Sequence, residues 1–160
     1  MEVHGPYYVK EKTWLFGRLK ASKLWKKANA EPDKLTEKQK ETLINGYKQK
    51  VKYMDYHLGQ LLKEIYDPES LIIITADHGE LLGEHGLFGH PSELYENLLR
   101  IPLLIKLPDS LSIYIKTKQI DIRVRSVDIV PTILDILEIT SETNLDGCSL
   151  LPLIKGIKQH

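Results

Sequence analysis

The feature that most constrains the fold is a short aliphatic run over residues 71–75, which follows a long amphipathic segment. The run is rich in β-branched side chains and has no polar alternation, which is typical of a strand buried on both faces of a parallel sheet. We therefore expect an α/β fold with a mixed, mainly parallel sheet flanked by helices. Its central strand would be residues 71–75.

The amphipathic segment before that run predicts a single long helix over residues 36–66. Thr36, followed three residues later by Gln39, is a capping box at its start, and Pro68 prevents it from continuing. Its apolar residues recur at spacings of three and four, so they share one face that would pack on the sheet. These residues are Leu43, Ile44, Tyr47, Val51, Met54, Leu58, Leu61, Leu62 and Ile65.

The rest of the chain predicts shorter elements around this helix and strand. A loose apolar pattern indicates a helix over 11–28, and residues 102–107 resemble a second buried strand. Weak alternation over 112–124 suggests edge strands. Asp128 is a candidate cap for a further helix with Pro131 in its first turn. A length of 160 residues fits one domain, so we expect residues 1–160 to form a single region.

Polar residues with metal-binding chemistry are concentrated directly after the predicted central strand. Residues 77–90 contain three His, one Asp and two Glu, interspersed with glycines. Carboxylate and imidazole together are ligands for ions such as Zn²⁺, Mn²⁺ or Fe²⁺. In open α/β sheets, ligands lie beyond the carboxyl ends of the strands, where this segment begins. The alternative is a loop with a capping aspartate and surface histidines.

Composition excludes some functions and weakens others. The formal net charge is zero, so the whole chain has no electrostatic attraction to nucleic acid or to anionic membranes. The Lys-rich segment 10–52 fits a solvated helix face, with polyanion binding as the alternative. The single cysteine, Cys148, excludes an intrachain disulfide and is expected to be a small buried hydrophobic residue. Without an apolar targeting or membrane-spanning segment, a cytoplasmic location is the default expectation.

Several motifs, taken in order, resemble the C-terminal part of sulfatases, a family of the alkaline-phosphatase superfamily. The resemblance covers nearly the whole chain and does not depend on one short match. The segments that carry it are His4-Gly5-Pro6-Tyr7, residues 53–59, Asp77-His78-Gly79-Glu80, Gly83-Glu84-His85-Gly86, residues 94–96, residues 100–102, the D-x-x-P-T-x-L-D stretch 128–135 and the D-G-x-S-L-x-P stretch 146–152.

The resemblance implies that Asp77 and His78 are ligands of a divalent metal ion. Many sulfatases have asparagine at the position of His78 and bind calcium. Family members with Asp-His include phosphonate and phosphate-ester hydrolases that use manganese, iron or zinc. An imidazole nitrogen favours these softer ions, so the expected cofactor is calcium, or manganese, zinc or iron because of the Asp-His pair.

The resemblance also implies catalytic roles for two other histidines. His90 occupies the position at which typical sulfatases have a lysine that contacts the sulfate oxygens, so a sulfate preference is in question. His4 matches a histidine that contacts the scissile ester group and protonates the leaving oxygen. His85 is expected to support the loop and not to bind metal.

The nucleophile of the family is missing from this sequence. Sulfatases carry a cysteine in C-x-P-x-R, or a serine or threonine there, near two more metal-binding aspartates. Cys148 has neither the proline nor the arginine at those offsets. The chain therefore resembles a C-terminal region without its nucleophile-bearing half. By itself it should bind metal weakly and show little turnover, since attack needs an activated nucleophile beside the metal.

The sequence thus predicts a sulfatase-like hydrolase of sulfate or phosphate esters, represented here by part of its active site. An alternative is a phosphodiester or phosphonate hydrolase, or a phosphotransferase, of the same superfamily. A third reading is a non-catalytic module that binds a partner chain. A missing half would leave a sheet edge exposed, which a homo-oligomer or an N-terminal partner chain could cover.

Overall fold

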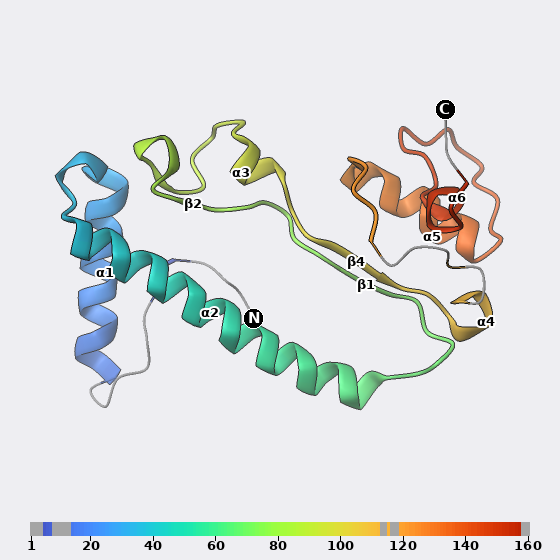
Figure 1. Ribbon diagram of the computed structural model, residues 1–160, viewed down its shortest axis with the longest axis horizontal. Coiled ribbons are helices and arrows are strands. Elements are labelled where there is room, and N and C mark those ends of the chain that lie inside the picture. The colour runs from blue at the N-terminus through green and yellow to red at the C-terminus, as the bar shows by residue number, and fades with distance from the viewer. Residues whose placement is uncertain (1–4, 8–13, 113–114, 116–118, 158–160) are drawn as a thin grey trace. The chain divides into compact units, whose positions relative to one another are not determined.

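The computed structural model describes residues 5–7, 14–112, 115 and 119–157, which group into two compact units (Figure 1). The first unit comprises the described parts of Met1–Asp67 together with Ile72–Lys106. The second comprises Pro68–Leu71 and the described parts of Leu107–His160. The expectation that residues 1–160 form a single sulfatase-like region stays a prediction.

Two long helices dominate the first unit, and short strands follow them. In chain order its elements are α1 (Trp14–Ala30), a 3₁₀ turn (Pro32–Lys34), α2 (Glu37–Ile65), β1 (Ile72–Thr75), β2 (Leu81–Leu82), a second 3₁₀ turn (Glu84–Gly86), β3 (Phe88–Gly89), α3 (Glu96–Leu99) and β4 (Leu103–Lys106). Among the helices described, none has the length and apolar character needed to cross a membrane.

The predicted capping box at the start of α2 is confirmed. The Thr36 hydroxyl accepts a hydrogen bond from the Gln39 backbone N–H at 3.3 Å, and the Gln39 side chain accepts one from the Thr36 N–H at 3.0 Å. These two bonds satisfy backbone donors that a helix N-terminus leaves unpaired. The helix ends at Ile65, three residues before Pro68.

The described strands pair antiparallel, so the predicted mainly parallel sheet is not confirmed. β1 pairs with β4, from Ile72 opposite Lys106 to Thr75 opposite Leu103, and β2 pairs with β3. Figure 1 shows β1 and β4 side by side. Side chains of β1 are half-buried and Thr75 is exposed. The aliphatic run identified a strand, but its composition does not encode the direction of the neighbouring strand.

The core of the first unit lies between α1, the start of α2 and β3. The buried residues are Ala28, Leu35, Leu43 and Phe88, with Leu24 and Trp25 packed against them. Tyr7, 4% exposed, makes edge-to-face contacts with the rings of Trp25 and Tyr47 at centroid distances of 4.8 and 5.5 Å. A Cβ on Gly46 would lie 2.8 Å from the Tyr7 Cβ. Glycine at this position therefore lets Tyr7 pack directly on α2.

The apolar face of α2 is covered at one end. Leu43, near the start of the helix, is 2% exposed, whereas Val51, Leu61 and Ile65 on the same face are 42%, 49% and 53% exposed. The predicted packing of this whole face is thus found for its first part. Its second part is partly open to solvent among the described residues, because Met54, Leu58 and Leu62 there are half-buried.

The second unit is built around α5 (Ile129–Ile136), preceded by a 3₁₀ turn (Ser126–Asp128) and followed by α6 (Leu151–Ile154). A short helix, α4 (Asp109–Ser112), begins the stretch where edge strands were expected. The described residues of 112–124 contain no strand, and 113–114 and 116–118 lie outside the described part of the chain. Weak alternation over this stretch was therefore not sufficient evidence for strands.

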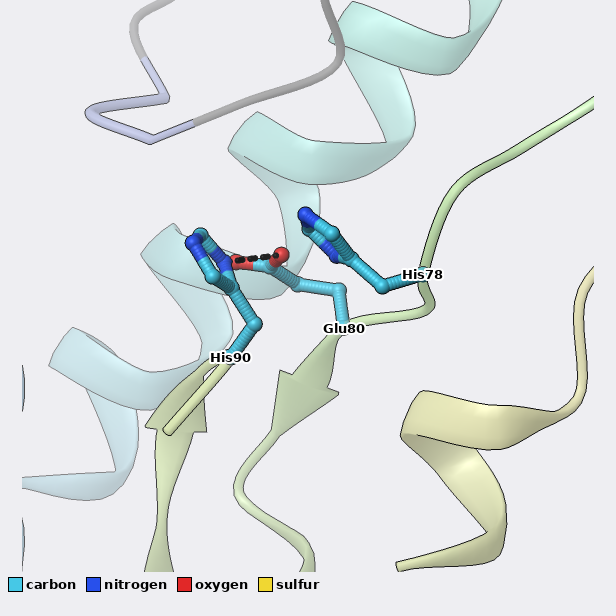
Figure 2. A group of neighbouring side chains, drawn as sticks. All are labelled: His78, Glu80 and His90. Atoms are coloured by element: carbon cyan, nitrogen blue, oxygen red, sulfur yellow. Dashed lines mark hydrogen bonds and ion pairs between the residues drawn. The ribbon is translucent and has the colours of Figure 1, made fainter. Parts of the chain in front are cut away.

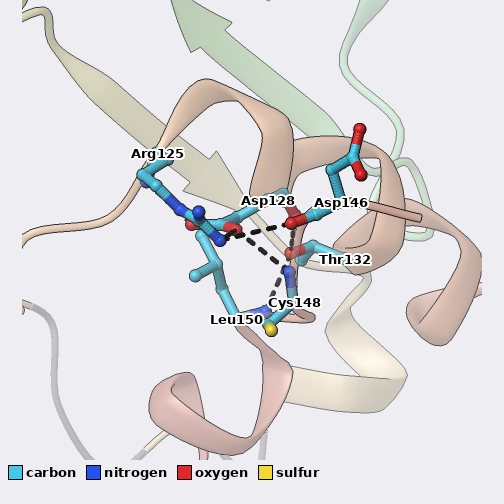
Figure 3. Close-up of polar contacts among 6 residues, drawn as sticks. All are labelled: Arg125, Asp128, Thr132, Asp146, Cys148 and Leu150. Atoms are coloured by element: carbon cyan, nitrogen blue, oxygen red, sulfur yellow. Dashed lines mark hydrogen bonds and ion pairs between the residues drawn. The ribbon is translucent and has the colours of Figure 1, made fainter.

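Asp128 stands at the N-cap position of α5, as predicted, but its side chain makes no capping bond there and joins two segments of the second unit (Figure 3). Its carboxylate accepts hydrogen bonds from the Arg125 and Cys148 backbone N–H groups at 2.7 and 3.0 Å and pairs with the Arg125 guanidinium at 3.2 Å. Burial by itself would raise the pKa of Asp128. The bonds from Cys148 and Arg125 outweigh burial and hold that pKa below its ordinary value.

A buried threonine and a glycine complete this junction. The Thr132 hydroxyl donates to the Asp128 carbonyl at 2.6 Å and accepts from the Leu150 N–H at 2.8 Å. A Cβ on Gly147 would lie 2.1 Å from the Val127 carbonyl oxygen, so only glycine fits there. This junction bonds the stretch 128–135 to the stretch 146–152, which explains physically why these two motifs occur in the same chain. Cys148 is exposed in this turn, which corrects the expectation that it is buried.

Candidate functional site

His78, Glu80 and His90 converge at one place in the first unit (Figure 2). Each offers one potential ligand atom, and these three atoms lie within 4.8 Å of one another. His78 and Glu80 belong to the loop that leaves β1, and His90 directly follows β3. This group of three side chains is the candidate site.

The local backbone brings these distant positions together. Gly79 N–H donates to the Leu98 carbonyl at 2.8 Å, and a Cβ on Gly79 would lie 1.9 Å from the Asn97 carbonyl oxygen. A glycine is therefore required where the loop passes α3. The β2–β3 pair, with Leu81 opposite Gly89, then returns the chain so that His90 lies beside Glu80.

Glu80 is the buried member of the group. Its side chain is 5% exposed, and its Oε2 lies 3.2 Å from Nδ1 of His90. Its Oε1 accepts a hydrogen bond from the Tyr7 hydroxyl. Burial, and then the hydrogen bond and negative charge of Glu80, raise the pKa of Tyr7 far above its ordinary value. Tyr7 thus remains a donor that fixes the carboxylate.

His78 is oriented by its own backbone. Its Nδ1 lies 2.8 Å from the Gly79 carbonyl oxygen. Because a carbonyl can only accept, Nδ1 donates in this contact, so Nε2 is the ring nitrogen left to bind a cation. The His78 and His90 rings lie 4.3 Å apart between centroids, with an angle of 30° between their planes.

Asp77 is not part of the three-residue group. Its side chain is 90% exposed, and its Oδ1 accepts a hydrogen bond from the His78 N–H at 3.0 Å. The same oxygen lies 3.9 Å from Nε2 of His78. The predicted ligand pair is therefore adjacent in space. However, the structure gathers His78 with Glu80 and His90 and not with Asp77.

The other predicted residues have different outcomes. His4 lies outside the described residues, so its predicted role is untested. His90 lies beside Glu80, as described above. The His85 ring stacks on Tyr95 at a centroid distance of 3.8 Å with an interplanar angle of 11°, which agrees with a role in supporting the loop.

Sequence reasoning missed Glu80 and Tyr7 as site residues. Glu80 carries a carboxylate between two histidines in the polar segment 77–90, so its residue type was a usable signal. Its contact with Tyr7 joins positions 73 residues apart, which no local pattern reports.

A cavity of about 300 Å³ adjoins the site on the side of His90. It is lined by Trp25, Ala28, Asn29, Pro32, Leu87, Phe88, Gly89, His90 and Pro91. Polar and apolar surface contribute equally to the lining, which includes one imidazole and one amide beside aromatic and aliphatic side chains.

The donor set fits part of a divalent metal site. Two imidazoles and a carboxylate suit zinc, manganese or iron better than calcium, which takes six to eight oxygen ligands. The carboxylate held by Tyr7 and paired with His90 is the kind of support that orients metal-binding histidines.

Comparison with solved structures identifies the class of fold. The structure of BT1596, a 2-O GAG sulfatase, matches with a TM-score of 0.69 at 21% identity, over 85% of this chain and 29% of that chain. The phosphonate monoester hydrolase SpPMH from Silicibacter pomeroyi matches with a TM-score of 0.68 at 28% identity, over 81% and 26%. The chain thus has part of the alkaline-phosphatase-like fold of sulfatases.

The chain belongs to the sulfatase family, because the sulfatase family model matches residues 2–139. Arylsulfatase K of Gallus gallus is 38% identical over 104 residues, which are 62% of this chain and 18% of that protein. Arylsulfatase K of Bos taurus is 35% identical over 123 residues, or 74% and 22%. The chain spans about a fifth of the length of these curated relatives.

Proposed function

We propose that this chain contributes part of the active site of a hydrolase that cleaves sulfate or phosphate esters at a divalent metal ion. The observation that carries the proposal is the convergence of His78, Glu80 and His90 beyond the carboxyl end of β1, in a member of the sulfatase family. Imidazole and carboxylate side chains at such a place can bind a cation, hold an anion and move protons.

In this proposal Asp77 and His78 hold the metal ion. The distance of 3.9 Å between Asp77 Oδ1 and His78 Nε2 requires a small rotation for both to reach one cation. When bound, the ion would act as a Lewis acid toward the ester. The carboxylate suits calcium, whereas the imidazole favours manganese, zinc or iron.

His90 and His4 handle the substrate in this proposal. His90 contacts the anionic part of the ester, with its ring oriented by the buried Glu80 carboxylate. His4 supplies the proton to the leaving oxygen. The cavity beside His90, half apolar and half polar in its surface, would receive the organic group of the ester.

The hydrolytic activity belongs to an assembly larger than this sequence. The C-x-P-x-R motif is absent, and two ligands from one segment leave a divalent ion under-coordinated. A nucleophile and further ligands must therefore come from outside these residues.

Two residues favour another activity of the same superfamily over that of a strict sulfatase. This activity would be that of a phosphonate or phosphodiester hydrolase, or of a phosphotransferase. His78 and His90 replace the asparagine and lysine that the sulfatase resemblance leads one to expect. A phosphonate monoester hydrolase is also among the similar structures, at 28% identity.

The test compares two ester classes on the native assembly that contains this chain. The assembly is stripped with a chelator and reloaded with Ca²⁺, Mn²⁺ or Zn²⁺. Hydrolysis of an aryl sulfate and of an aryl phosphonate is then followed. We expect metal-dependent hydrolysis of at least one ester, with Asp77→Ala lowering it at least 100-fold and Asp55→Ala leaving it unchanged. Full activity in the Asp77→Ala variant would refute the ligand assignment.

A second candidate function is non-catalytic binding of a partner chain, which one observation favours. The apolar face of α2 is exposed at Val51, Leu61 and Ile65, although the same face is buried at Leu43. The occupant we propose is the polypeptide that supplies the remainder of the sulfatase fold, since the chain spans 18–22% of the curated relatives. Assembly without hydrolysis of either ester would favour this function.

A further inference from the structure

We propose that His78, Glu80 and His90 form a second cation site, complete within this chain, that takes a transition-metal ion such as Zn²⁺ or Ni²⁺. It requires neither Asp77 nor any residue from outside the chain, and it does not depend on ester hydrolysis. His78 is common to this site and to the Asp77–His78 pair, so one ion at a time can use it.

The distances allow this site to form with small movements. The three potential ligand atoms lie within 4.8 Å of one another. Zinc bonds of about 2.0–2.2 Å in a tetrahedral site place neighbouring ligand atoms about 3.3 Å apart. The atoms would therefore approach by about 1.5 Å at most. The His78 and His90 side chains are 41% and 34% exposed, so an ion can reach them from solvent.

Partners already hold two of the three side chains in place. The Tyr7 hydroxyl fixes one oxygen of Glu80, and the other oxygen lies 3.2 Å from the His90 ring. The Gly79 carbonyl holds Nδ1 of His78, so Nε2 is the nitrogen left for the ion. Such contacts raise the affinity of a site because fewer side-chain orientations are lost when the ion binds.

The composition of the group selects the class of ion. Two imidazoles and one carboxylate are the protein ligands of many tetrahedral zinc sites, in which water takes the fourth position. Calcium and magnesium need more oxygen ligands than these three residues provide. The site should therefore prefer Zn²⁺ or Ni²⁺ over Ca²⁺ and Mg²⁺.

The experiment titrates the folded 160-residue chain with Zn²⁺ in an isothermal titration calorimeter at pH 7.5. We expect one saturable site. His90→Ala and Glu80→Gln should each weaken binding at least 10-fold, since loss of an outer-shell partner alone costs about 10- to 100-fold. Asp77→Asn should bind within about 3-fold of the original chain. His57→Ala, on α2, is the control for histidines outside the site and should also have little effect.

Three results would overturn the inference. One is the absence of saturable Zn²⁺ binding by the folded chain. Another is loss of affinity in Asp77→Asn with none in His90→Ala, which would place the ion at the Asp77–His78 pair. The third is an equal loss in His57→Ala, which would indicate scattered surface binding. Circular dichroism without metal verifies that each variant is folded. Failure of the proposed hydrolysis would not alter this calorimetric result, so the two proposals fail separately.

Discussion

Glu80 links the two histidines of the candidate site to the interior of the first unit. Its carboxylate is buried, contacts His90 and is fixed by Tyr7, which itself packs on α2 and on Trp25. A buried carboxylate is costly unless hydrogen bonds compensate for lost hydration. The position of His90 therefore depends on a tyrosine 73 residues before Glu80.

Replacing Tyr7 with phenylalanine tests this link. The variant keeps the aromatic packing but leaves the buried Glu80 carboxylate without its tyrosine donor. We expect the free energy of unfolding to fall by about 1–3 kcal/mol, measured by urea denaturation. Tyr53→Phe, on the exposed part of α2, is the control and should change it by less than about 0.5 kcal/mol. Equal effects of the two variants would contradict the link.

Asp128 gives the second unit a predictable response to acid. Its pKa is lowered in the folded state, so its ionised form favours folding. This contribution is fully present above the ordinary aspartate pKa of about 3.9 and is lost as pH falls through the lower folded value. We expect thermal stability to drop below about pH 4, and Asp128→Asn to flatten this part of the profile. A variant that keeps the original slope would show that other groups cause the drop.

Local sequence was sufficient to select His78 and His90 but not to find their buried partner. Both histidines lie in the segment 77–90, whose polar density after an apolar strand was visible in the sequence. Glu80 lies in the same segment. However, its burial follows from packing against Tyr7, which is a long-range contact.

At the scale of elements, the start and stop signals of α2 were read correctly, whereas the Asp128 capping bond and the pairing of strands were not. The capping box at Thr36 and the break before Pro68 are local signals, and α2 ends close to where they predict. The antiparallel pairing of β1 with β4 depends on how the chain returns through α3, which the aliphatic run over 71–75 does not encode.

Two glycine substitutions separate a required glycine from a dispensable one. Gly79→Ala would place a Cβ 1.9 Å from the Asn97 carbonyl oxygen, so the loop that carries His78 and Glu80 must shift. We expect a loss of more than about 2 kcal/mol in the free energy of unfolding, a size typical of core overpacking. Gly59→Ala, in α2 with nothing within 4 Å of the new Cβ, should stabilise by about 0.5–1 kcal/mol. Denaturant unfolding would measure the free energy of unfolding of both variants. A similar loss in each would contradict the close approach of Gly79 to the Asn97 carbonyl.

At the scale of the whole molecule, the chain is a member of the sulfatase family that covers about a fifth of its curated relatives. The exposed Val51, Leu61 and Ile65 on the α2 apolar face agree with the proposal that further elements of the fold pack there. Family motifs could reveal membership, but the expected cytoplasmic location and the single-region organisation stay predictions.

The α2 face can be tested by charge insertion. Leu61→Lys should reduce the fraction of the chain found in its larger native assembly, because an unpaired charge would be buried at the contact. The same change should alter the chain's own unfolding free energy by less than about 0.5 kcal/mol, since Leu61 is already 49% exposed. Gln49→Lys, an exposed position off this face, is the control. Size-exclusion chromatography of co-expressed chains would measure the assembled fraction for both variants. Undiminished assembly of Leu61→Lys would remove this face from the contact.

In our proposal this chain holds part of a sulfatase-like active site that residues outside it complete. The most direct test captures the native assembly from source cells with an antibody against the chain. Its hydrolysis of aryl sulfate and aryl phosphonate is then compared with that of the 160-residue chain by itself. We predict chelator-sensitive hydrolysis by the captured assembly and background rates for the separate chain. Metal-dependent turnover by the separate chain, abolished by Asp77→Ala, or no hydrolysis by the captured assembly, would contradict the claim.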